Sequence, residues 1–221
     1  MPDESRSALG PTERTALRRK RERGNHDRDV VNGILDEALV AHVGFVTPEG
    51  PLVIPMTYVR IDEELYLHGA AGNALLRRLA TGVDVCVTVT LLDGLVFARS
   101  AFHHSMNYRS VVLLGRAVRV TDLAEMRAAS ARLLDHLAPG RSRDARPPTD
   151  DELRATLLVR LSIMEGSAKV RSGGPIEEPA DLDLPVWAGE LPLRLSANSE
   201  LADHHGLPQP TPKYITEHSL R

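Results

Sequence analysis

The 221-residue sequence predicts a mainly β protein with peripheral helices, built on an antiparallel sheet that curves into a closed or nearly closed barrel. Three observations favour this fold class. Roughly seven short segments alternate apolar and polar residues as strands do, tight turns join most of them, and few helical segments interrupt them. Tight turns connect antiparallel strands, whereas parallel strands need long crossovers. Closure into a barrel would also hide the strand edges.

The composition allows an aliphatic core and argues against nucleic acid as the main binding partner. Hydrophobic residues make up 42% of the chain but aromatic residues only 4%, so Val, Leu and Ala must fill the interior. A net charge of -3 gives no electrostatic support for nucleic acid as the main partner. The single cysteine, Cys86, rules out an internal disulfide and suits a reducing compartment. No segment has the length of a membrane span and the polar N-terminus resembles no signal peptide, so we expect a cytoplasmic protein.

The first part of the chain is predicted to form helical segments followed by a hairpin. The expected elements, in order, are a disordered tail (1–11), a short charged helix (12–23), an amphipathic helix from Asp27 onward with Asn25 or Asp27 as its cap, a hairpin (41–61) and a strand (65–68). Pro55 lies in the second strand of the hairpin and has no amide to donate. Its strand must therefore be an edge, contain a bulge, or face a ligand at that point.

Glycines and alanines at 68–73 lead into a short helix at 74–80. Free amides at the start of a helix suit a phosphate, although a plain strand-to-helix turn explains the same residues. The later elements are strands at 83–90, 95–102, 110–120 and 157–164, a helix at 123–137 capped by Thr121 or Asp122, a helical turn after Thr149, and an extended arm whose apolar part is 182–195.

Polar and ionisable side chains are concentrated at 100–110, between two predicted strands. A buried Arg109 would need a partner, which either the protein or an anionic ligand supplies. A solvated hairpin loop explains the stretch as well. The adjacent His103 and His104 would point to opposite faces of a strand without other ligands at metal spacing, so no metal site is predicted. With His42 and His68 they could still contribute to a haem or metal site in three dimensions.

The remaining chemistry is that of a site with an anion-binding end and an apolar body. No G-x-S-x-G nucleophile elbow is present, which argues against a hydrolase. Arg109, Ser110 and the turn at 68–73 could bind a phosphate, and the strand at 52–58 could contact a flat hydrophobic ring. A flavin mononucleotide (FMN) has these two parts.

Five segments in this order resemble the pyridoxamine 5'-phosphate oxidase-related flavoproteins, in particular the branch that includes the nitroimidazole-resistance reductases. The segments are 53–56, 65–70, 85–89, 101–112 and 184–189. The resemblance covers 12–193, which would form one FMN-binding split-barrel domain, with 194–221 as a loose C-terminal tail. It implies an antiparallel split β-barrel, a homodimer, and FMN bound at the subunit interface.

The resemblance also implies which residues bind the cofactor, while it identifies no catalytic residue. The expected set is Val53, Ile54, Pro55, Met56, Thr57, Tyr58, Leu67, His68, Gly69, Asn73, Arg109, Ser110 and Lys169. The oxidases have Ser-Arg-Lys for the phosphate where this chain has Gly72-Asn73-Ala74. The phosphate would then depend on backbone amides, Asn73, Arg109, or the pair Arg77 and Arg78.

We therefore expect an FMN-dependent oxidoreductase that transfers electrons from NADH or NADPH to a small organic acceptor, as a nitroreductase does. One alternative is a non-catalytic protein that binds, stores or senses a flavin or haem, and another is the same fold with deazaflavin or haem in place of FMN. A pyridoxamine phosphate oxidase is a further alternative, although the segment around Trp187 lacks the substrate signature of those enzymes. No metal, nucleic acid or membrane partner is expected.

Overall fold

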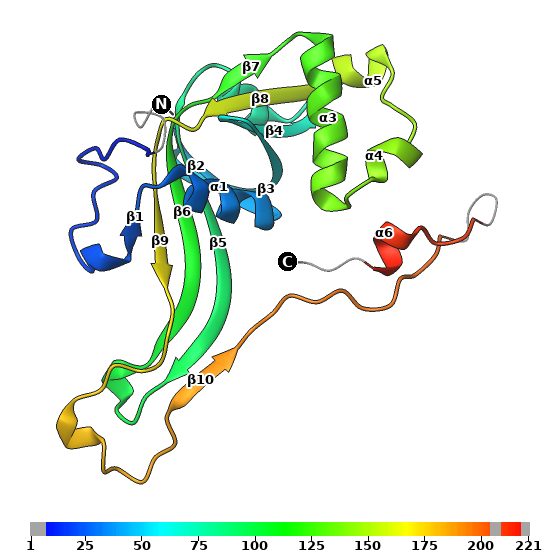
Figure 1. Cartoon of the computed structure of the whole chain (residues 1–221). Helices are drawn as coiled ribbons and strands as arrows, with labels where there is room; N and C mark the ends of the chain where they lie inside the picture. The colour runs from blue at the N-terminus through cyan, green and yellow to red at the C-terminus, as the bar shows by residue number, and fades with distance from the viewer. Residues whose placement is uncertain (1–7, 204–208, 218–221) are drawn as a thin grey trace, which may run out of the picture.

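The computed structural model describes residues 8–203 and 209–217 and contains one antiparallel sheet with helices around it (Figure 1). The strands are β1 (Gly24–Asn25), β2 (Val40–Thr47), β3 (Gly50–Ile61), β4 (Glu64–Ala70), β5 (Asp84–Phe97), β6 (Ser105–Arg116), β7 (Val118–Val120), β8 (Thr156–Ser162), β9 (Glu165–Arg171) and β10 (Gly189–Pro192). The α-helices are α1 (Arg28–Glu37), α2 (Ala74–Leu79), α3 (Leu123–Leu137), α4 (Arg141–Asp144), α5 (Asp150–Arg154) and α6 (Lys213–Thr216).

The strand order is β1-β9-β6-β5-β2-β3-β4-β8-β7, and β10 pairs with β5 beside this path. All paired strands are antiparallel, which confirms the predicted mainly β, antiparallel architecture. Within the described residues no pairing joins β1 to β7, so the sheet is strongly curved but open. The sequence favoured a closed or nearly closed barrel, and the pairings correct that expectation.

Side-chain caps begin several of the helices that pack on the sheet or beside it, among them α1, α3 and α5. Asp27 accepts hydrogen bonds from the amides of Asp29 and Val30 at the start of α1, and Asp122 accepts from the amide of Glu125 at the start of α3. Thr149 forms a capping box with Glu152 at α5. Each cap satisfies amides that have no partner within the helix. The predicted starts of these three helices are therefore confirmed.

The helices and the sheet pack around two apolar cores. The main core lies between the sheet and α1 and includes Val31, Leu35, Val43, Val87 and Leu113. The second core is smaller and lies where α3 and α5 cover β3, β4 and β8. It is formed by Val59, Tyr66, Val120, Met126, Ala129, Leu153 and Leu158. Strand β4 therefore contributes to both cores, because successive side chains along a strand point to opposite faces.

The N-terminal segment differs from the prediction. The expected helix at 12–23 is absent from the described structure except for one 3-10 turn, η2 (Arg21–Arg23). Thr12 and Arg14 instead bond to Glu165 of β9, which holds the chain as a loop. Leu9, placed by the prediction in a disordered tail, is fully buried in the main core. Residues 1–7 of that predicted tail lie outside the described residues.

The strand predictions beyond residue 83 need two corrections. The predicted strands 83–90 and 95–102 are joined in a single strand, β5, which ends at Phe97 and has a register irregularity between Leu92 and Gly94. The polar stretch at 100–110 is only partly a connection: η3 (Ala101–His103) makes the turn, and β6 already begins at Ser105. Strand β9 was not predicted, although residues 167–171 alternate polar and apolar side chains as a strand does.

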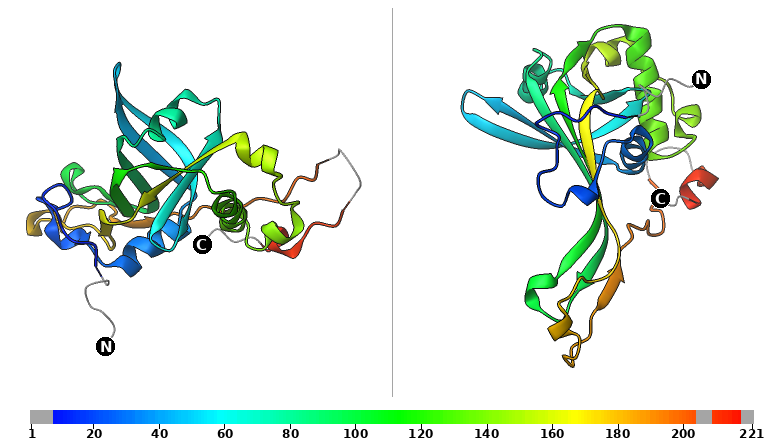
Figure 2. Two further views of the ribbon diagram at one scale, coloured as in Figure 1. Left: turned by 90° about the horizontal axis from the view of Figure 1, so that it is seen from above. Right: turned by 60° about the vertical axis from the view of Figure 1, so that its left-hand side comes forward.

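Strands β5 and β6 extend beyond the curved sheet as a long hairpin, and β10 runs along β5 (Figures 1 and 2). The C-terminal arm therefore pairs with this chain's own hairpin at Gly189–Pro192, while most large apolar side chains at 182–195 stay exposed. A hydrogen-bond network supports this pairing: the buried Arg171 donates to the buried Asn107, whose amide donates to the exposed Glu190 at 2.6 Å. In the described part of the chain, no helix has the length and hydropathy needed to cross a membrane.

Candidate functional site

A hollow of about 450 Å³ lies between β3, the end of β4 and the start of α2, and it brings together much of the expected site. We call it the β3–α2 hollow. It is lined by Ile54, Pro55, Met56, Thr57, His68, Gly69, Asn73, Leu75 and Leu76. All of these except Leu75 and Leu76 belong to the set expected from the sequence. The lining combines apolar side chains with three polar groups, which are the imidazole of His68, the amide of Asn73 and the hydroxyl of Thr57.

The hollow exists because one edge of β3 is open over much of its length. Residues 50–57 pair with β2, whereas the pairing with β4 begins only at Tyr58, opposite Leu67. Pro55 lies in the open part, where the missing amide removes no hydrogen bond on the β4 side. Gly69 closes the hollow from the other side, since α2 packs so tightly that a Cβ on Gly69 would be 2.3 Å from Cδ1 of Leu76.

A second pocket, of about 310 Å³, lies between α3, α5 and the outer face of β3, β4 and β8. We call it the α3–α5 pocket. Its lining residues are Val59, Tyr66, His68, Met126, Ala129, Ser130, Leu133, Leu134, Arg146, Pro148, Glu152, Leu153, Thr156 and Leu158. Apolar side chains dominate, and the charged members, Arg146 and Glu152, bond to each other at 2.7 and 3.0 Å. This pairing holds the pKa of Glu152 down at about 2.

His68 borders both hollows. It is half-buried, and burial lowers the pKa of its imidazole below the ordinary value, so the ring is neutral at physiological pH. Among the described residues its ring makes no hydrogen bond. By contrast, His26 and His136 are bound to the backbone carbonyls of Gly166 and Ala38. A neutral, partner-free imidazole between two cavities is a suitable ligand for a metal centre.

The expected phosphate site at the start of α2 is less open than its sequence indicated. The side chain of Asn73 accepts hydrogen bonds from the amides of Leu75 at 2.9 Å and Leu76 at 3.2 Å. These are the amides that a phosphate would use, and α2 is only six residues long. Arg77 and Arg78 follow in the last turn, are exposed, and have no ion pair within the described chain.

Arg109 and Ser110 are neighbours in β6 and therefore point to opposite faces of the sheet. Arg109 faces α1, where Glu37 and Asp93 hold its guanidinium through four hydrogen bonds. These bonds raise the pKa of Arg109 above its ordinary value, with the Glu37 bond as the largest cause. The hydroxyl of Ser110 donates to the carbonyl of Lys169 on β9 at 3.3 Å. All three residues lie across the sheet from the β3–α2 hollow, with β2 and β5 in between.

Three further residues of the expected set, Val53, Tyr58 and Leu67, do not line the β3–α2 hollow. Val53 is 61% exposed on the outer face of β3, whereas Tyr58 and Leu67 are fully buried in the main core. The hydroxyl of Tyr58 donates to the carbonyl of Leu35 at 2.6 Å, and burial raises its pKa. No three His, Cys, Asp or Glu side chains within 8–203 and 209–217 form a cluster that could hold a metal ion by themselves.

The α3–α5 pocket was not anticipated. Met126, Ala129, Ser130 and Leu133 follow helical spacing, so the sequence marked an apolar stripe on α3. An apolar stripe indicates burial against some neighbour, but it does not distinguish a filled interface from one that retains a cavity. Only the packing of α3 on the outer face of the sheet reveals the pocket.

The family model described as pyridoxamine 5'-phosphate oxidase matches residues 27–170. No curated protein sequence matches the chain. Among solved structures, the flavocytochrome Anf3 from Azotobacter vinelandii is 38% identical with a TM-score of 0.88, covering 94% of this chain and 97% of its own. The FAD and haem binding protein from Mycobacterium smegmatis is 33% identical with a TM-score of 0.86, covering 90% and 99%.

A protein assigned to 5-nitroimidazole antibiotic resistance in Bacteroides thetaiotaomicron is 24% identical with a TM-score of 0.53, covering 65% of this chain and 84% of its own. At that identity the similarity concerns the fold alone. The family match spans β2 to β9 and includes both hollows. This chain belongs to the pyridoxamine 5'-phosphate oxidase family.

Proposed function

We propose that this protein is a flavohaem electron-transfer protein that binds FAD in the β3–α2 hollow and haem in the α3–α5 pocket. The observation that carries the proposal is the position of His68, whose neutral and unpartnered imidazole borders both cavities. Two relatives more than 30% identical support it, one a flavocytochrome and the other named for FAD and haem. The sequence led us to expect FMN, and we propose FAD instead because the second of these relatives is named for FAD.

The residues of both sites fit these groups. A cavity of about 450 Å³ is within the range of about 300–1,000 Å³ that small-molecule sites have. Ile54 and Met56 offer apolar contacts to a flat ring, and the open edge of β3 leaves backbone groups for its polar rim. The α3–α5 pocket offers an apolar enclosure with one imidazole, and histidine is a common axial ligand of haem iron.

Each side chain then has a defined task. His68 would hold the haem and, because it borders the β3–α2 hollow as well, would keep the two cofactors close. Met126, Leu133 and Leu158 exclude water from the haem side. Arg146 lies at the pocket lining and can turn from Glu152 to a haem propionate. When bound, the flavin supplies two-electron chemistry and the haem one-electron chemistry.

The uncovered face of the sheet suits a second copy of the chain. Val53, Cys86 and Leu114 lie in one cross-strand row with Gly44, on the face opposite the main core. Val46 and Val53 at the rim are 68% and 61% exposed. Exposed apolar surface of this kind is typical of a contact surface. A homodimer through this face would bring Ser110 and Lys169 of one subunit toward the flavin of the other.

Purification of the wild-type protein, followed by an absorption spectrum and identification of the released pigments, tests the proposal. We expect FAD and haem in the same protein. His68→Ala should lose haem while the matched variant His42→Ala, at an exposed histidine of β2, keeps it. A protein that contains flavin but takes up no added haem would instead support the oxidoreductase that passes electrons from NADH or NADPH to a small acceptor. A colourless protein that binds neither cofactor would overturn both.

A further inference from the structure

The N-terminal segment forms a loop that closes on itself. The amide of Leu9 donates to the carbonyl of His26 at 2.7 Å, and Ala8 forms a bridge with Asp27. Residues 10–25 therefore leave and return to one point beside β9 (Figure 1). This closure defines an Ω-loop, a compact loop type that frequently carries function. We call it the N-terminal loop.

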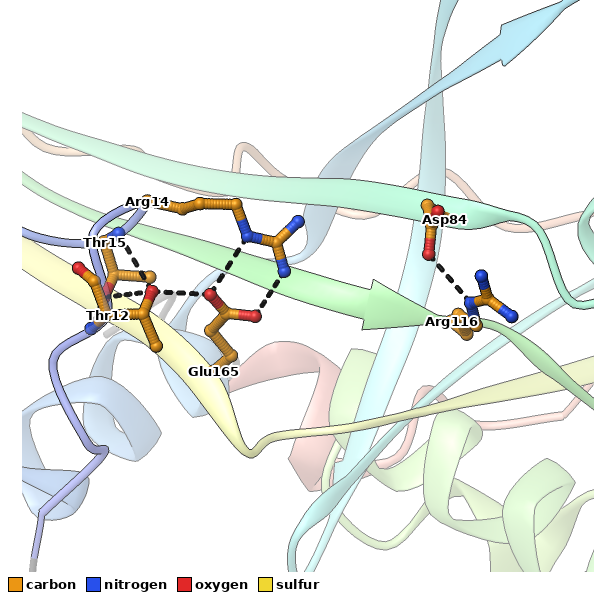
Figure 3. A network of polar contacts seen from close by, with 6 residues as sticks. All are labelled: Thr12, Arg14, Thr15, Asp84, Arg116 and Glu165. Atoms are coloured by element: carbon orange, nitrogen blue, oxygen red, sulfur yellow. Dashed lines mark hydrogen bonds and ion pairs between the residues drawn. The ribbon is translucent and has the colours of Figure 1, made fainter.

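Contacts with β9 fix the shape of this loop. The hydroxyl of Thr12 and the guanidinium of Arg14 both bond to the carboxylate of Glu165 (Figure 3). At the other end, Gly24 and Asn25 pair with β9 as strand β1. Leu17 packs over Gly24 so closely that a Cβ there would be 2.6 Å from its Cδ1. The loop is thus a built structure that holds its side chains in place.

A hollow of about 470 Å³ opens in the loop. It is lined by Pro11, Glu13, Ala16, Leu17, Arg18, Arg21, Gly24 and His26. None of these residues contributes to the β3–α2 hollow or the α3–α5 pocket. The lining combines an apolar wall, two guanidinium groups and one carboxylate.

Arg18 and Arg21 at this hollow belong to a run of four cations. Arg18, Arg19, Lys20 and Arg21 are consecutive and exposed, and within the described residues none has an ion pair or a side-chain hydrogen bond. Arg14, a few residues earlier, is paired with Glu165. Lys20 also has a left-handed backbone with φ of 57°. Such a conformation costs a non-glycine residue about 1–2 kcal/mol, and strain of this kind clusters at ligand sites.

We infer that the N-terminal loop binds the adenosine diphosphate group of a dinucleotide. Arg18 and Arg21 line the hollow and match a diphosphate, which guanidinium groups bind through paired hydrogen bonds. Ala16 and Leu17 provide an apolar wall for the flat base, and Glu13 is an acceptor for a ribose hydroxyl. The inference rests on the proposed function, because the dinucleotide is either the reduced nicotinamide donor or the FAD that a second subunit of the proposed homodimer binds in its β3–α2 hollow.

Calorimetric titration of the purified, cofactor-loaded protein with ADP tests the site. The test variant is Arg18→Ala/Arg21→Ala, and the matched control is Arg119→Ala, an exposed arginine of β7 without an ion pair in the described chain. If the loop binds the electron donor, wild type binds ADP, the double variant binds it at least tenfold more weakly, and the control stays within twofold. All three proteins then keep the same flavin and haem content.

If the loop instead holds the adenosine diphosphate half of FAD, wild type binds ADP only after the flavin is removed, and the double variant releases flavin on gel filtration. The inference is overturned if wild type binds no ADP with or without flavin, if the double variant behaves as wild type, or if pyrophosphate displaces ADP with equal affinity. A colourless wild-type protein that still binds ADP would refute the proposed function and leave the loop site intact.

Discussion

Gly69 at the end of β4 and Leu76 in α2 approach so closely that no side chain fits between them. A Cβ on Gly69 would lie 2.3 Å from Cδ1 of Leu76, and Leu76 is itself 1% exposed. Leu76 cannot move out into solvent, since it packs in the main core. This contact sets the position of α2 against β4 and thereby one wall of the β3–α2 hollow.

Gly69→Ala should therefore destabilise the protein by about 1–3 kcal/mol, the usual cost of an added methyl in a packed core. Flavin affinity should fall as well, because Leu76 lines the hollow. Urea denaturation and a flavin titration measure the two effects. Gly72→Ala is the control: its Cβ meets nothing within 4 Å, so both quantities should stay near wild type. Equal stability of the two variants would contradict the packing argument.

Arg109→Ala should reduce stability by about 1–2 kcal/mol, since it leaves the carboxylates of Glu37 and Asp93 facing each other without their shared cation. Flavin content should not change, because the guanidinium faces α1. Arg116→Ala removes a pair whose partners are 71% and 75% exposed, visible in Figure 3, and should change stability by less than about 0.5 kcal/mol. If the Arg109→Ala variant lost flavin without losing stability, Arg109 would be part of the flavin-binding site after all.

Tyr58→Phe should cost about 1–2 kcal/mol. The carbonyl of Leu35 lies in the last turn of α1, where helix carbonyls lack an internal partner, and the Tyr58 hydroxyl supplies one at 2.6 Å. Thermal unfolding followed by circular dichroism measures the loss. Tyr108→Phe is the comparison, because Tyr108 is half-buried and its hydroxyl makes no hydrogen bond within the described residues. A Tyr58 variant as stable as that control would mean that water replaces the bond.

Acidification should destabilise the cofactor-free protein through His68. Burial lowers the pKa of this imidazole in the folded state, whereas the unfolded chain keeps a value near 6.5. Below pH 6.5 the unfolded state binds more protons than the folded state, so the free energy of unfolding falls as the pH falls toward the folded-state pKa. Melting temperatures from pH 7.5 to 5.5 should drop less steeply in His68→Gln. Parallel curves for wild type and variant would exclude this contribution.

Local sequence determined most of the secondary structure. The caps at Asp27, Asp122 and Thr149 begin helices because their side chains satisfy amides three residues or fewer away. The hairpin of β2 and β3 likewise follows from alternation, and the edge that β3 leaves open at Pro55 is one of the three explanations that the missing amide allowed. These features depend on residues that are close together in the chain, so they can be predicted from the sequence.

Tertiary structure decided which polar residues meet. The sequence placed Arg109 and Ser110 in one site, but strand alternation sends them to opposite faces, and Arg109 meets Glu37, 72 residues away along the chain. The charged segment at 12–23 had helical composition, yet its bonds to Glu165 of β9 made it a loop. His68 acquired its position between two cavities only when α2 and α3 packed on either side of β4. Such contacts join residues far apart in the chain, so local propensity carries no information about them.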